Sequence, residues 1–147
     1  MDLILYSSKK GATKKVADLI NERLENSRTV NINKETPNLN DYESIYIGTP
    51  IYIGMINKKI KKFISENKEL LIRKNIKVFL VGMNETEIDN VITNNFPDGI
   101  SSKANIVHVG GAYYFEKLNF LQKIVVKKIT GITKTTESFK YDVINDL

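Results

Sequence analysis

The sequence predicts an α/β fold in which a parallel sheet is covered by helices on both faces. Short apolar runs alternate along the chain with longer amphipathic segments, the order typical of strands and helices wound around one sheet. The runs lack a polar face, as expected for strands buried on both sides. With 147 residues, 41% hydrophobic and 27% charged, we expect one globular domain spanning residues 1–147.

Four largely apolar runs and one alternating segment predict the strands. The apolar runs cover residues 3–6, 44–47, 76–81 and 105–109, and each is followed by glycine or serine. Residues 28–32 alternate between polar and apolar side chains, which is typical of a short edge strand. Residues 33–41, with Pro37 and several asparagines, indicate a loop.

Helical spacing of apolar residues predicts the helices. The first is residues 13–24, with Val16, Ala17, Ile20 and Leu24 on one face. Further helices are expected over residues 57–65, 85–95 and 116–129, and a short terminal one near Tyr141 to Leu147.

The loop between the first strand and the first helix has the character of an anion site. It is rich in hydroxyl groups, and it ends at a helix N-terminus, where free backbone N–H groups and the positive end of the helix dipole point outward. Lys9, Lys10, Lys14 and Lys15 crowd this end, where cations are mildly disfavoured. A bound phosphate would reverse that effect; the alternative is that the lysines simply point into solvent. A nucleoside-triphosphate P-loop is excluded, because Gly11 is followed by Ala-Thr.

A second loop, residues 49–55, follows the third strand. Gly48 and Gly54 allow close backbone approach or a positive φ, and Pro50 stiffens the turn. Tyr52 offers a flat apolar face with a polar tip, suited to stacking on a flavin ring. The alternative is an ordinary strand-to-helix turn with Tyr52 packed on its neighbours.

Three segments together resemble the flavodoxin superfamily and, within it, the bacterial menaquinone-dependent protoporphyrinogen dehydrogenases. In the first, Ser8-Lys-Lys-Gly-Ala-Thr13 is similar to the flavodoxin phosphate loop, Ser/Thr-x-Thr-Gly-x-Thr, with Lys10 in place of the second Thr. The second segment is Ile47-Gly-Thr-Pro-Ile-Tyr-Ile-Gly54. The third is Val109-Gly-Gly-Ala-Tyr-Tyr-Phe115. A basic helix and then Thr130-Gly-Ile-Thr-Lys-Thr-Thr136 follow it, as in the dehydrogenase subgroup.

This resemblance implies a flavodoxin-like three-layer sandwich whose five parallel strands are ordered 2-1-3-4-5. It also implies one non-covalently bound FMN. By position, the phosphate would lie on Ser7, Ser8, Lys9, Lys10, Gly11, Ala12 and Thr13. The ring would lie between Thr49, Pro50, Ile51, Tyr52, Ile53 and Gly54 on one side and Gly82 and Met83 on the other. Gly111, Ala112 and Tyr113 would close the third side.

The sequence indicates no side chain that acts as nucleophile, general acid or metal ligand. In a flavodoxin the flavin is the redox centre. The single histidine, His108, lies in the apolar run 106–109, and we interpret it as a core residue. No cluster has metal-ligand spacing, and the absence of cysteine removes thiol chemistry. A phospho-acceptor receiver domain, which shares this fold, is excluded because Ser7-Ser8 and Gly48-Thr49 stand where its carboxylates would be.

Charge distinguishes the chain from flavodoxins that shuttle electrons between soluble partners, which are typically acidic. The net charge is +5, and the helix over residues 117–129 carries an apolar stripe of Leu118, Leu121, Val125 and Ile129 flanked by lysines. Such a helix either lies on an anionic membrane surface or covers the sheet with a solvated lysine face. The lysines are spread over several helices without a reading surface, so nucleic acid is not expected as a partner.

Three functions therefore stay open. The first is an FMN electron carrier that serves a redox partner protein. The second is a membrane-associated protoporphyrinogen dehydrogenase that reduces a quinone. The third is an interaction module that no longer binds flavin, since Lys10 departs from the phosphate-loop pattern. The chain begins with a strand and has no apolar run of about 18 residues, so we expect a cytoplasmic location, either free or peripheral on the inner face of the membrane.

Overall fold

Five parallel strands form the centre of the protein in this computed structural model, which describes residues 1–114, 117, 119–130 and 135–147. The strands are β1 (Asp2–Tyr6), β2 (Ser27–Asn31), β3 (Ser44–Tyr52), β5 (Asn75–Val81) and β6 (Asn105–His108). They are ordered β2-β1-β3-β5-β6, and a short strand, β4 (Met55–Ile56), pairs antiparallel with the end of β3. The predicted five-stranded order is thereby confirmed.

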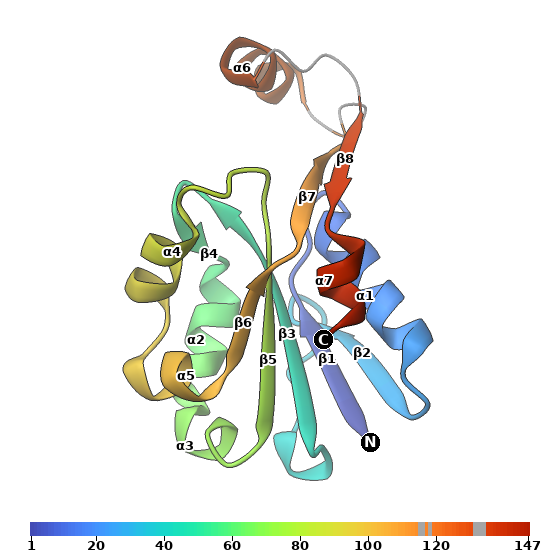
Figure 1. Ribbon diagram of the computed structural model, residues 1–147, viewed down its shortest axis with the longest axis vertical. Coiled ribbons are helices and arrows are strands. Elements are labelled where there is room, and N and C mark those ends of the chain that lie inside the picture. The colour runs from blue at the N-terminus through green and yellow to red at the C-terminus, as the bar shows by residue number, and fades with distance from the viewer. Residues whose placement is uncertain (115–116, 118, 131–134) are drawn as a thin grey trace.

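Helices cover both faces of the sheet, which gives three layers (Figure 1). Successive residues of a strand point to opposite faces, so Leu3 and Leu5 join one core cluster while Ile4 and Tyr6 join the other. One face packs on α1 (Ala12–Arg23) and α7 (Tyr141–Asn145). The other packs on α2 (Lys58–Glu66), α3 (Lys68–Leu71), α4 (Ile88–Asn95) and α5 (Asp98–Lys103), and the 3₁₀ turn η1 (Leu39–Asp41) lies in the loop before β3.

An arm, defined here as β7, α6 and β8, was not expected from the sequence. β7 (Gly110–Tyr113) and β8 (Thr136–Phe139) form an antiparallel ribbon beyond the carboxyl ends of the parallel strands, with α6 (Phe120–Thr130) at its far end (Figure 1). The third resembling segment therefore forms a strand over residues 110–113, and the basic helix stands away from the sheet instead of covering it. Leu118 and residues 131–134, which belong to the predicted stripe and to the third resembling segment, lie outside the described residues.

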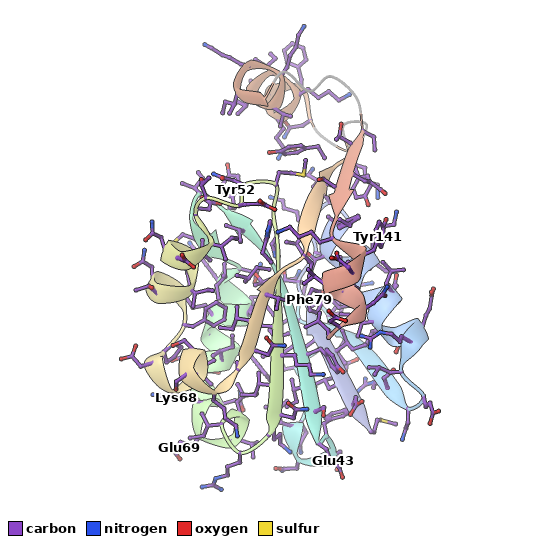
Figure 2. The ribbon with its side chains drawn as sticks, viewed as in Figure 1. Glu43, Tyr52, Lys68, Glu69, Phe79 and Tyr141 are labelled. Carbon is purple, nitrogen blue, oxygen red and sulfur yellow. The ribbon has the colours of Figure 1, made fainter. Side chains whose placement is uncertain are left out.

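The second predicted loop is also largely extended. β3 continues through Pro50, which lies opposite Val81 of β5, and ends at Tyr52. A two-residue turn of Ile53 and Gly54 then leads into β4. Proline is tolerated here because it lies near the end of the β3–β5 ladder, where the one hydrogen bond that its missing N–H would donate matters least. Tyr52 marks this hairpin in Figure 2.

Candidate functional site

The four segments predicted to surround a cofactor meet at the carboxyl edge of the sheet. The N–H of Ser7 donates to the carbonyl of Gly48 at 3.0 Å, which joins the predicted phosphate loop to the end of β3. The N–H of Gly82 donates to the carbonyl of Gly110 at 2.8 Å, which joins the loop after β5 to the start of β7. A Cβ on Gly111 would lie 2.8 Å from the carbonyl carbon of Gly82, so only glycine permits this approach. In open α/β sheets this edge is the usual place for a ligand.

The predicted phosphate loop fits an anion. Gly11 caps α1 with φ 105°, and its N–H donates to Ser8 Oγ at 3.1 Å. The first-turn N–H groups at Ala12 and Thr13 have no intrahelical acceptor, and no side chain of the described residues caps this end, so they can bind an anion. Ser7, directly after β1, and Thr13, in the first turn of α1, are both buried.

Carboxylates balance the charge of two of the lysines near this loop, which the sequence did not indicate. Lys14 pairs with Asp18, and Lys15 pairs with Glu137 of β8, both at 2.7 Å. Each pairing raises the pKa of the lysine through the hydrogen bond to its carboxylate. Because acids already balance these two charges, the crowding of lysines is weaker evidence for a phosphate than the loop geometry.

The β3–β4 hairpin carries exposed apolar side chains at the same edge of the sheet as the predicted phosphate loop. Tyr52 is 77% exposed and Ile53 is 81% exposed, so neither is packed on its neighbours. Ile53 and Gly54 have φ of 49° and 72°, a pair typical of a type I′ turn. A positive φ at Gly54 was anticipated from the sequence, whereas a positive φ at a β-branched isoleucine was not.

Asn95, a residue that the sequence did not single out, holds this hairpin. It is buried at the end of α4, and its amide nitrogen donates to the carbonyls of Gly54 at 2.9 Å and Val91 at 2.8 Å. Its amide oxygen accepts the N–H of Ile56 at 3.3 Å. Every polar atom of the side chain is thus used to position the turn. The sequence indicated only that Asn95 lies at the end of a predicted helix, just before Phe96 and Pro97.

The Thr49 hydroxyl and the missing side chain at Gly48 both have a structural role. The Thr49 hydroxyl is fully buried, donates to the carbonyl of Pro50 at 3.0 Å and accepts the N–H of Asn57 at 2.9 Å. Gly48 allows a close approach, as expected from the sequence, and the group that approaches is a side chain of the core: a Cβ there would lie 2.2 Å from the ring of Phe79. Phe79 is buried at the centre of the sheet (Figure 2).

The interpretation of His108 as a core residue is wrong. It is the last residue of β6, is half-buried, and bonds polar partners on both ring nitrogens. Nε2 lies 2.6 Å from the carbonyl of Gly82 and Nδ1 lies 3.1 Å from Lys140 Nζ, so a neutral ring with its proton on Nε2 satisfies both contacts. Lys140 also pairs with Glu85 at 2.6 Å, and this hydrogen bond and charge lower the pKa of Glu85.

The third side of the predicted site lies on the arm. Gly111, Ala112 and Tyr113 pair in β7 with Ser138, Glu137 and Thr136 of β8. Ala112 and Tyr113 are half-buried, and Met83 in the facing loop is also half-buried. The arm thereby borders both the loop after β5 and the predicted phosphate loop.

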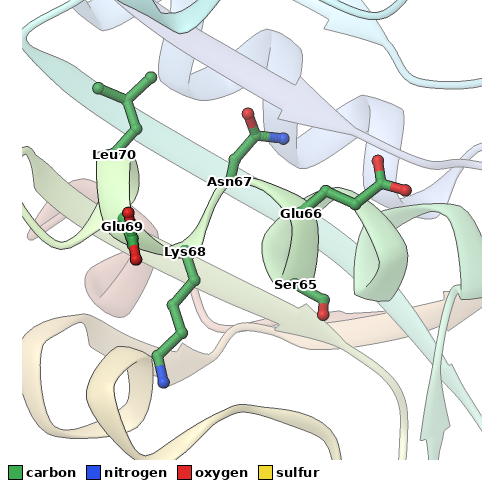
Figure 3. Close-up of a pocket in the computed structure, with 6 residues that line it drawn as sticks. All are labelled: Ser65, Glu66, Asn67, Lys68, Glu69 and Leu70. Atoms are coloured by element: carbon green, nitrogen blue, oxygen red, sulfur yellow. The ribbon is translucent and has the colours of Figure 1, made fainter.

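A separate hollow lies at the other end of the molecule. It is lined by Ser65, Glu66, Asn67, Lys68, Glu69 and Leu70 at the connection of α2 and α3 (Figure 3). These residues are consecutive in the sequence and run from the end of α2 into α3. The hollow includes none of the predicted site residues, and we assign it no ligand.

Comparison with known proteins agrees with this architecture. The model of a protein family described as a flavodoxin domain matches residues 3–140. A flavodoxin from Clostridium saccharobutylicum is 42% identical over 74 residues, which cover 45% of each chain, so less than half of that relative is spanned.

Solved structures show the same fold at low identity. A flavoprotein from Lactobacillus acidophilus, solved in complex with FMN, superposes with a TM-score of 0.55 at 24% identity, over 75% of this chain and 91% of that one. Flavodoxin 1 from Bacillus cereus superposes with a TM-score of 0.51 at 16% identity, over 73% of this chain and 83% of that one.

Proposed function

Because the chain belongs to the flavodoxin domain family, we propose that it is a redox protein that holds one FMN without a covalent bond and transfers electrons through it. The observation that carries the proposal is the meeting of an uncapped helix N-terminus with an exposed aromatic hairpin at one edge of the sheet. Bound there, FMN would supply one- and two-electron transfer.

The residues divide the work of binding. The backbone N–H groups of Ala12 and Thr13 are suited to the phosphate, since they lie at the positive end of α1. Tyr52 and Ile53 offer exposed apolar surface to the ring. The loop at Gly82 lies next to this hairpin, because a Cβ on Gly82 would be 3.6 Å from the Cβ of Ile51.

Titration of the purified protein, freed of flavin, with FMN tests the proposal. We expect saturable quenching of flavin fluorescence and a perturbed visible spectrum. Gly11→Val should abolish this binding, because φ 105° strains any L side chain and the new Cβ would crowd Lys117 and Tyr114. Tyr52→Ala should weaken it by about 0.5–1.5 kcal/mol beyond the lost area. Failure of the unaltered protein to bind micromolar FMN would refute the proposal and favour a flavin-free interaction module.

A second candidate is a membrane-associated dehydrogenase that oxidises protoporphyrinogen and reduces a quinone. The observation that favours it is α6, whose Phe120, Leu121 and Ile129 are each more than 70% exposed, next to exposed Lys127 and Lys128. Apolar side chains flanked by lysines suit the surface of an anionic bilayer. Among the described residues no helix is long and apolar enough to cross a membrane.

Two measurements separate this candidate from a simple electron carrier. Co-sedimentation with phosphatidylglycerol vesicles should be strong for the unaltered protein and lost in Leu121→Glu, with Asn94→Glu as a control for the added charge on an exposed surface. Turnover of protoporphyrinogen with a menaquinone analogue would establish the enzyme. Without turnover, the function is electron transfer to a redox partner protein.

A further inference from the structure

Two residues that follow β7, Tyr114 and Lys117, lie against the predicted phosphate loop. Nζ of Lys117 lies 3.1 Å from the position that a Cβ on Gly11 would take, and ring carbons of Tyr114 lie 3.8 and 4.0 Å from it. Lys10 Nζ donates to the carbonyl of Lys117 at 3.0 Å, which ties Lys117 to the loop. A lysine far along the chain is therefore brought directly to the cap of α1.

Tyr114 is held in place by a hydrogen bond to β8. The Tyr114 hydroxyl donates to Glu137 at 3.0 Å, and Glu137 also pairs with Lys15 of α1. Burial and the bond to Glu137 raise the pKa of Tyr114, so the phenol remains a neutral donor at physiological pH. Lys117 Nζ lies 5.2 Å from the centroid of the Tyr114 ring, a favourable cation–π distance.

The charge of Lys117 is not balanced as its neighbours' charges are. Lys14 and Lys15 each have a carboxylate at 2.7 Å. Within the described part of the chain, no carboxylate forms an ion pair with Lys117. An ammonium beside an uncapped helix N-terminus is mildly disfavoured, and a doubly charged phosphate between them would bind both.

We propose that Lys117, which lies between β7 and α6, is an FMN-binding residue that supplies a cation to the phosphate group. This inference rests on the proposed function and names a contact beyond the backbone cradle of the loop. The backbone N–H groups orient the phosphate, and Lys117 adds charge from the opposite side. The contact discriminates FMN from riboflavin, which has the same ring and no phosphate.

The experiment compares the affinities of FMN and riboflavin for the full chain. Lys117→Gln should weaken FMN about tenfold and leave riboflavin unchanged, since one charge-assisted hydrogen bond at a partly exposed site is lost. The decline of FMN affinity with added salt should become shallower in this variant. Lys117→Arg should restore most of the FMN affinity, and Lys128→Gln, which removes an exposed charge from α6, should change neither ligand.

The outcomes separate this inference from the proposed function. Unchanged FMN affinity in Lys117→Gln would overturn the inference alone. An equal loss for FMN and riboflavin would also overturn it, because the residue would then support the arm and not the phosphate. No binding of either flavin by the unaltered protein would overturn the proposed function together with this inference.

Discussion

Replacing Ile53 by asparagine is expected to stabilise the protein. Ile53 occupies the first position of a two-residue hairpin turn with φ 49°, in the left-handed region. An L residue in this region costs about 1–2 kcal/mol, because its Cβ approaches the following carbonyl oxygen. Asparagine adopts the region readily, and Asn-Gly is the preferred pair for a turn of this type.

The structure sets the size of the gain. Burying an isoleucine side chain completely contributes about 1.5–3 kcal/mol. Ile53 is 81% exposed, so its removal loses at most about 0.6 kcal/mol of burial. The net stabilisation is therefore about 1 kcal/mol, which raises the Tm of a chain of this size by about 2–4 °C.

Thermal unfolding of the flavin-free protein, followed by circular dichroism, measures this effect. Ile53→Thr is the matched control, because it introduces a polar side chain while keeping the β-branch that is strained at positive φ. We expect no gain from Ile53→Thr. If Ile53→Asn unfolded at or below the temperature of that control, the strain argument would be refuted.

The same variant tests why the strain is kept. Strained residues persist where the surrounding structure or the function demands them. If Ile53 contacts the flavin ring, Ile53→Asn should be more stable yet bind FMN more weakly. A stabilised variant with unaltered FMN affinity would place Ile53 away from the ring.

Three further variants test the packing and the electrostatics of this edge. Asn95→Leu should lower the free energy of unfolding by about 2–4 kcal/mol in urea titrations, since it leaves buried backbone groups unpaired; Asn94→Leu, on the exposed side, should change it little. Gly48→Ala should destabilise by at least about 1–3 kcal/mol because its Cβ overlaps Phe79, and Gly48→Ala with Phe79→Leu should be less destabilised than the sum of the single changes. Glu85, whose pKa is lowered by its lysine partner, stabilises the fold above the ordinary glutamate pKa of about 4.3, and this contribution is lost as pH falls through the lower pKa of the folded state. Glu85→Gln should therefore flatten the loss of stability between pH 5 and 3; an identical slope would contradict the pairing.

The strands and both cores followed from the sequence because burial on two faces leaves a simple record. A run such as residues 3–6 has no polar position, so its place between two helical layers can be read directly. The loop at Gly11 was also visible, since a hydroxyl-rich turn before a helix requires few residues and little tertiary context.

The arm could not be read in this way. β7 begins with two glycines, and its partner β8 lies more than twenty residues later, so neither strand has a local signal. Pro50 was taken as a turn residue, whereas near the end of the β3–β5 ladder it is tolerated. His108 sits in an apolar run, and only the approach of Gly82 and Lys140 from other segments reveals its polar setting.

The ribbon of β7 and β8 begins beside the predicted phosphate loop and carries α6 at its far end (Figure 1). When two binding events both depend on how one element sits, each changes the affinity of the other by the same factor. A surface that holds α6 with the arm in this position would therefore tighten binding at the loop, and a filled loop would strengthen the hold on α6. Binding of α6 to a surface and binding of FMN at the loop would then be thermodynamically coupled, so that a change in either would change the other.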